Sequence, residues 1–149
     1  MPFLPKLHAA AGAVAMLTIL GLQTAIALGE PTGYPAEIAA LRKTVLYIVC
    51  LVLIPAMIAA GASGFRLGRG WRSPVIAAKR ARMQAIAAIG LIVLLPLAIG
   101  LWALAAQGMV EGRFHLLQRI ETLAGLVNLV LLGLNMRDGL RLRRRPVPA

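Results

Sequence analysis

The polar side chains of the last apolar segment have the spacing that could most clearly carry chemistry. They recur at intervals of three and four residues, which places them on one face of a single helix. That face consists of Gln118, Glu121, Gly125, Asn128, Leu132 and Asn135. Its polar members, here called the polar seam, are Gln118, Glu121, Asn128 and Asn135. Because amides and carboxylates lack hydrogen-bond partners in lipid, the polar seam is predicted to face a bundle interior or a partner subunit.

Two interpretations of the polar seam stay open. In the first, its side chains hold helices together and the asparagines set the register. In the second, the seam is a ligand, cofactor or proton site, with Glu121 as the titratable group. An ionised carboxylate in hydrocarbon is costly, so Glu121 is predicted to be protonated or to have a partner at its own depth. The candidate partners are Gln107, Arg42 and Lys43.

The two histidines are the candidate haem ligands. A b-type haem in a membrane bundle needs two axial side chains at the same depth. His8 opens the first apolar run and His115 opens the last, so the topology derived below puts them on opposite sides of the membrane. A His–Met pair stays open, with Met83 at the depth of His8 and Met109 beside His115. Haem b is therefore an alternative, bound through His8, Met83 or His115.

Residues suited to enzymatic catalysis are few. The chain holds two serines, Ser63 and Ser73, and one aspartate, Asp138. Ser73, His8 and Asp138 share one predicted side, but nothing brings them together, and Ser73 is better explained as a helix cap. The single cysteine, Cys50, excludes an internal disulfide and a CxxC zinc site. The sequence predicts no catalytic or metal site, and we expect the protein not to be an enzyme.

The elements that must position these residues are four apolar helices. Hydrophobic residues make up 60% of the 149-residue chain and charged residues 14%, against roughly 25% charged in soluble domains. The apolar runs cover about 7–29, 43–65, 83–107 and 114–136, and a membrane span needs about 20 residues. The first run exceeds the apolar part of a signal peptide, so we expect it to be retained. The predicted fold is an all-α four-helix transmembrane bundle forming a single integral-membrane domain, residues 1–149.

The net charge of +11 is unevenly distributed between the two predicted sides. One side carries 12 basic residues and one acid, while the other carries four of each. Since cytoplasmic loops are enriched in Lys and Arg, both termini and the segment 66–82 are predicted to be cytoplasmic. Anionic lipid head groups, rather than nucleic acid, are the expected partners of the basic residues. These are Arg66, Arg69, Arg72, Lys79, Arg80, Arg82, Arg141, Arg143, Arg144 and Arg145.

Prolines predict where two helices begin and where two are interrupted. Pro35 suits the first turn of the second helix, and Ser73 followed by Pro74 suits an N-cap and first turn of the third. Pro55 and Pro96 lie in the middle of the second and third spans. Each removes a backbone hydrogen bond, so both helices are predicted to be kinked there. The kinks are interpreted either as hinges or as static bends.

Small residues recur at four-residue spacing in the first two helices. Such stripes let helix backbones approach closely, within the chain or against a partner. The stripes consist of Gly21, Ala25 and Gly29, and of Ala56, Ala60 and Gly64.

Three segments resemble a family of small four-span bacterial inner-membrane proteins of uncharacterised function. The segments are Leu7-His8-Ala9, Ala77 to Met83, and Gly133 to Leu140. The resemblance covers nearly the whole chain and implies the fold and the membrane, but no activity. The architecture is also similar to that of cytochrome b561-like four-helix bundles, although the paired histidines of those bundles are missing here.

These observations favour a non-enzymatic integral membrane protein, an accessory or assembly subunit of a membrane complex. Its partner would be another membrane protein or a second copy of the chain. One alternative is a small b-type haem or quinone-interacting electron carrier. A second alternative is a small proton-coupled transporter that uses the proline-containing helices and Glu121.

Overall fold

The computed structural model is an all-α bundle and describes residues 3–31, 33–70 and 73–143. Among these residues, four continuous helical rods are long and apolar enough to cross a membrane. Two of the rods contain a π-helical segment in their middle. The elements in order are α1 (Phe3–Gly29), α2 (Pro35–Ile48), η1 (Val49–Leu53), α3 (Ile54–Leu67), α4 (Pro74–Ala88), η2 (Ile89–Leu94), α5 (Leu95–Ala106) and α6 (Arg113–Arg143).

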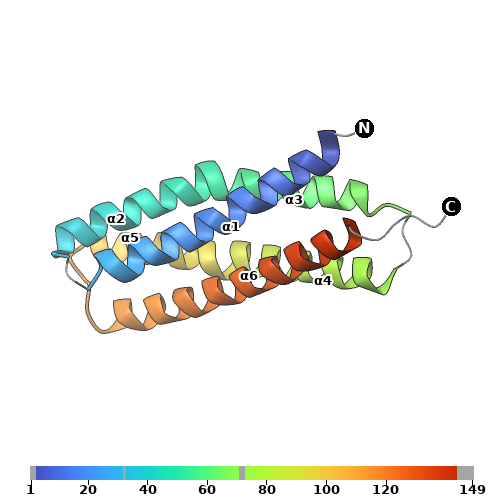
Figure 1. Cartoon of the computed structure of the whole chain (residues 1–149). Coiled ribbons are helices and arrows are strands. Elements are labelled where there is room, and N and C mark those ends of the chain that lie inside the picture. Colours follow the sequence, from blue (N-terminus) through green and yellow to red (C-terminus); the bar gives the residue numbers. More distant parts are fainter. Residues whose placement is uncertain (1–2, 32, 71–72, 144–149) are drawn as a thin grey trace.

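The four rods lie side by side with alternating direction (Figure 1). The start of α1, the connection from α3 to α4 and the end of α6 lie at one end of the bundle, and the other two connections lie at the opposite end. α1 packs against α3 and α6, α2 packs against α5, and α4 packs against α6. Helix α6 therefore contacts both α1 and the α4–α5 rod, which places its polar face where three rods meet.

The predicted helix starts at Pro35 and Pro74 are confirmed, because each proline occupies the first turn of its helix. Ser73 holds the N-cap position before Pro74 with extended backbone, but its hydroxyl makes no capping hydrogen bond. At the start of α2 the backbone N–H of Tyr34 donates to Glu37 Oε2 at 3.0 Å. Both rods that begin at these prolines contain 33 residues, or about 50 Å at the α-helical rise, which exceeds the ~30 Å hydrocarbon core.

A π-helical segment precedes each mid-span proline. Segment η1 ends two residues before Pro55 and η2 ends two residues before Pro96. In each, an N–H donates to the carbonyl five residues earlier, from Ile54 to Val49 and from Leu95 to Gly90. A wider turn accommodates the proline ring and satisfies backbone groups that a regular helix would leave unpaired. Both prolines are exposed on the outside of the bundle.

Large apolar side chains cover the outside of the bundle, and charged and polar side chains are buried among apolar ones inside it. Leu51 and Ile92 are each 73% exposed, and many other large apolar side chains of the rods are exposed as well. The buried charged and polar residues are Glu30, Arg42, Ser63, Glu121, Asn128, Asn135 and Asp138. Apolar outward faces around a polar interior are what a hydrocarbon solvent selects. This arrangement supports a multi-pass membrane protein.

Candidate functional site

The polar seam of α6 begins at a buried group of charges, here called the glutamate cluster: Glu30, Arg42 and Glu121. Arg42 Nη1 donates to Glu121 Oε2, and Arg42 Nε forms an ion pair with Glu30 Oε1 that lacks hydrogen-bond geometry. Arg42 is 1% exposed, Glu121 6% and Glu30 7%. One guanidinium therefore bridges two carboxyl groups in the protein interior.

Three elements position the glutamate cluster. Glu30 extends the last turn of α1, since its N–H donates to the Ile26 carbonyl at 3.1 Å. Arg42 lies on the buried face of α2, together with Ile38 and Val45. Glu121 comes from the third turn of α6. Burial raises the pKa of the Glu30 carboxyl, and the positive charge of Arg42 opposes that rise.

Aromatic and amide side chains complete the surroundings of Arg42. The Phe114 ring lies below the guanidinium, with Cζ 5.4 Å from the ring centroid, a cation–π distance. Gln118 Nε2 donates to Glu30 Oε2. His115 is exposed, and its Nδ1 lies 3.3 Å from Gln118 Oε1. A line of polar contacts thus leads from the exposed histidine to the buried glutamates.

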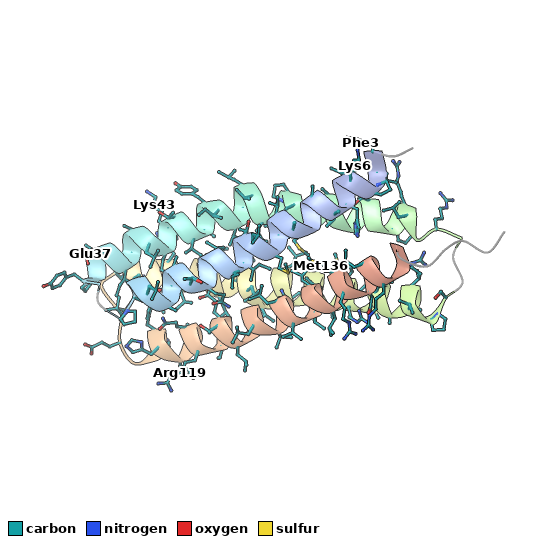
Figure 2. The ribbon with its side chains drawn as sticks, viewed as in Figure 1. Phe3, Lys6, Glu37, Lys43, Arg119 and Met136 are labelled. Atoms are coloured by element: carbon teal, nitrogen blue, oxygen red, sulfur yellow. The ribbon has the colours of Figure 1, made fainter. Side chains whose placement is uncertain are left out.

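The basic residues next to the glutamate cluster, Lys43 and Arg119, are not buried as Arg42 is. Figure 2 shows Lys43 and Arg119 directed away from the bundle. Lys43 lies over the exposed Tyr47 ring, with Nζ 6.0 Å from the centroid. Of the three candidate partners named for Glu121, Arg42 makes the contact, while Gln107 donates to the Ala103 carbonyl of its own helix at 3.0 Å.

The middle of the polar seam makes weaker contacts. Asn128 Nδ2 donates to the Ile86 carbonyl of α4 at 3.4 Å, while its Oδ1 is buried without a hydrogen-bond partner among the described residues. Gln23 of α1 donates to the Thr122 carbonyl at 3.1 Å. Gln23 fits because residue 125 is glycine: a Cβ added there would lie 1.9 Å from Gln23 Nε2.

The polar seam ends at a second charged group, here called the aspartate cluster: Arg82, Asn135 and Asp138. Arg82 Nη1 donates to Asn135 Oδ1 at 2.9 Å and to Asp138 Oδ2 at 2.8 Å. Asn135 Nδ2 donates to the Lys79 carbonyl at 3.4 Å. Arg137 also approaches Asp138, at 3.4 Å, with its own side chain 53% exposed. This cluster joins α4 to α6.

The candidate haem ligands do not come together. His8 Nδ1 lies 3.0 Å from the Ala60 carbonyl and 3.2 Å from Ser63 Oγ, so its contacts are with α3. His115 lies at the opposite end of the bundle, where α6 begins. Met83 packs against the apolar cluster of Ile19, Ile86 and Leu132. The described contacts of His8 are those of a residue that packs α1 onto α3.

The residues assigned to lipid head groups fall into three sets. Arg66, Arg69 and Arg141 are exposed. Arg80 donates to the Gly68 carbonyl at 2.6 Å, Lys79 is half-buried, and Arg82 turns inward to the aspartate cluster instead of outward. The side chain of Arg143 and the positions Arg72, Arg144 and Arg145 lie outside the described residues.

Sequence reasoning missed Glu30 and Asp138 as members of the clusters and assigned a third member, Arg82, to lipid head groups. Asp138 continues the helical interval of the polar seam, three residues after Asn135, so the spacing could have found it. Glu30 follows α1 directly, and only the contact of α1 with α6 brings it to Arg42. The interval Ile38, Arg42, Val45 is itself a helical face and could have marked Arg42 as buried.

No protein-family model, curated protein or solved structure matches the chain.

Proposed function

We propose that the protein is a non-enzymatic integral membrane protein and acts as an accessory or assembly subunit of a bacterial inner-membrane complex. One observation carries the proposal: the polar residues inside the bundle contact one another across helices, and the surface left for partners is apolar. The connections between the described rods are short, so the faces of the helices make up most of the described surface that a partner could contact. A partner would therefore be recognised within the membrane.

The two small-residue stripes suggest where a partner helix would pack. Ala60 is buried, and a Cβ added to Gly64 would lie 2.9 Å from His8 Cε1, so the stripe on α3 is used within the chain. Gly21 and Ala25 on α1 are exposed, and a Cβ at Gly21 would meet no atom within 4 Å. The exposed stripe on α1 allows the close backbone approach typical of helix pairs in lipid.

The proposed orientation has both termini and the α3–α4 connection in the cytoplasm. It is supported by the excess of basic residues at the end of the bundle where these segments meet. Exposed arginines there, including Arg66, Arg69 and Arg141, would contact anionic lipid head groups. Kinks at Pro55 and Pro96 belong to the same proposal, because a π-helical turn before a proline allows a helix to bend. Labelling cysteines introduced at Glu111 and Arg69 tests the orientation, since only Glu111→Cys should react from outside intact cells.

Purification in mild detergent tests the proposed role. We expect the tagged protein to be colourless and to elute with a second membrane protein, or with a second copy of itself. Gly21→Leu should release that partner because the larger side chain separates the helix backbones. Gly133→Leu on α6, where an added Cβ also meets no atom within 4 Å, is the matched control.

Two other results of that experiment would contradict the subunit proposal. A visible absorption band that shifts on reduction would favour the haem-binding alternative, and His8→Ala would then test the ligand. A monomer that elutes alone, with or without Gly21→Leu, would leave the accessory role without support. The proton-coupled alternative is favoured by one specific observation, the excess of carboxyl groups in the glutamate cluster.

A further inference from the structure

The glutamate cluster contains more acid than base. Two carboxyl groups, Glu30 and Glu121, contact one guanidinium, and all three side chains are buried. If both carboxyl groups were ionised, the cluster would carry one uncompensated negative charge in a medium of low dielectric constant. Such a charge is strongly disfavoured, and a carboxyl group avoids it by keeping its proton.

The contacts of Arg42 also favour a protonated carboxyl group in the cluster. Its guanidinium gives one nitrogen to each carboxyl group, Nε to Glu30 and Nη1 to Glu121. Neither carboxyl group receives the paired, fork-like contact that most strongly stabilises a carboxylate. The remaining nitrogen, Nη2, is buried without a hydrogen-bond partner among the described residues. The guanidinium therefore compensates one negative charge, divided between two carboxyl groups.

We propose that the glutamate cluster is a proton-binding site, in which Glu30 and Glu121 share one exchangeable proton beside Arg42. When the proton leaves, the O–H bond of one carboxylic acid breaks, its electron pair stays on the carboxylate and the proton passes to water. A proton needs no cavity, so the close packing around Arg42 is compatible with the site. The proposal is independent of whether the protein is a subunit of a larger complex.

Other titratable or charged groups at this end of the bundle do not supply the missing positive charge. Helix α2 also carries Glu37 and Lys43, both exposed. The first turns of α6 also carry Arg113, His115 and Arg119, all exposed. The part of α5 that packs here contributes Leu101 and Ala105 to the core, and its described residues include no titratable side chain. The charge of the buried cluster is thus set by Glu30, Arg42 and Glu121 alone among the described residues.

Polar contacts also connect the site with the exposed end of the bundle. Gln118 contacts Glu30 on one side and His115 on the other. His115 is exposed, so this line of contacts ends at the surface of the bundle. The proton would therefore enter and leave at the end of the bundle where α6 begins, close to the cluster.

Infrared difference spectroscopy of the protein in lipid nanodiscs tests the proposal. At neutral pH the unaltered protein should show the carbonyl-stretch band of one protonated carboxyl group, shifted in D2O and lost at alkaline pH. Glu30→Gln and Glu121→Gln should each abolish the band, because the remaining carboxylate then pairs one-to-one with Arg42. Glu111→Gln, which removes an exposed carboxyl group, should leave the band unchanged.

A second measurement needs no variant and so does not depend on variants that fold. Isotopic labelling of glutamate carboxyl carbons in the unaltered protein should shift the same band, which excludes Asp138 as its source. Absence of the band at neutral pH would overturn the proposal. A band that persists in both Glu30→Gln and Glu121→Gln would overturn it as well, since the proton would then reside elsewhere.

Discussion

The two charged clusters of the bundle differ in their balance of charge and in their exposure. In the glutamate cluster two acids contact one base, and the arginine side chain is fully buried. In the aspartate cluster one acid, Asp138, is approached by Arg82 and Arg137. The side chain of Arg82 is 21% exposed there and that of Asp138 is 11% exposed. The glutamate cluster is thus closed to solvent and has an excess of acid. The aspartate cluster is partly open to solvent and has an excess of base.

This difference shows that the asymmetry of charge along the sequence extends into the interior of the bundle. The basic end of the molecule has a basic cluster, and its charges reach the head-group region, where water and lipid phosphates can compensate them. The opposite end carries equal numbers of acidic and basic residues in total, but its buried cluster has an excess of acid. Only the second arrangement leaves a charge that the protein itself must neutralise, which is why the proton site is proposed there.

The largest difference between the clusters should appear when each arginine is removed. Arg42→Met leaves two buried carboxyl groups without a positive partner, and breaking a buried ion pair in this way costs about 3–5 kcal/mol. We expect a corresponding fall in the free energy of unfolding, measured by denaturation in detergent. Lys43→Met, which removes the neighbouring exposed charge, should change little. Equal stability of the Arg42 and Lys43 variants would mean that the glutamate cluster is not closed to water.

The equivalent change in the aspartate cluster should have a smaller effect. Arg82→Met removes hydrogen bonds to Asn135 and Asp138, but Arg137 stays beside the carboxylate and water reaches it. We expect a loss of about 1–2 kcal/mol. The contribution of Arg82 should also weaken as salt is added, because a partly exposed pair is screened. A salt-independent effect, or a loss as large as that for Arg42→Met, would contradict the distinction between a closed and an open cluster.

Stability should depend on pH through Glu30 in a direction set by its raised pKa. Because folding raises this pKa, the folded state holds the proton more tightly than the unfolded chain does. The stabilisation is complete below the ordinary pKa of glutamate and is lost as the pH rises through the folded-state pKa. Thermal denaturation at several pH values should therefore show that the wild-type protein becomes less stable as the pH rises from the ordinary pKa of glutamate to the folded-state pKa of Glu30. Glu30→Gln should flatten the profile, and an unchanged profile would assign the dependence to another group.

The sequence predicted some parts of this arrangement well because helical periodicity determines which residues share a face. The interval along α6 identified Glu121, Asn128 and Asn135 together, and the three are buried. Proline chemistry located the starts of α2 and α4. Periodicity cannot determine which helices are neighbours, so Glu30 at the end of α1 was not connected to Arg42. Arg82 was assigned to lipid for the same reason: its acidic partner lies on another helix.

The smallest effect is expected midway between the clusters, at Asn128. Its amide makes one long hydrogen bond, 3.4 Å to the Ile86 carbonyl, and Oδ1 has no partner among the described residues. Asn128→Leu removes that bond but also removes the cost of burying an unpaired oxygen, so the two terms oppose each other. Interhelical hydrogen bonds in membranes average about 0.6 kcal/mol, and we expect a change in the free energy of unfolding no larger than this.

Asn128→Asp keeps the size of the side chain but adds a titratable group to a buried position, and it should be clearly more destabilising at neutral pH. If Asn128→Leu were instead as damaging as Arg42→Met, the middle of the polar seam would have a role that its contacts do not explain, and the comparison of the two ends would no longer describe how the bundle is held together.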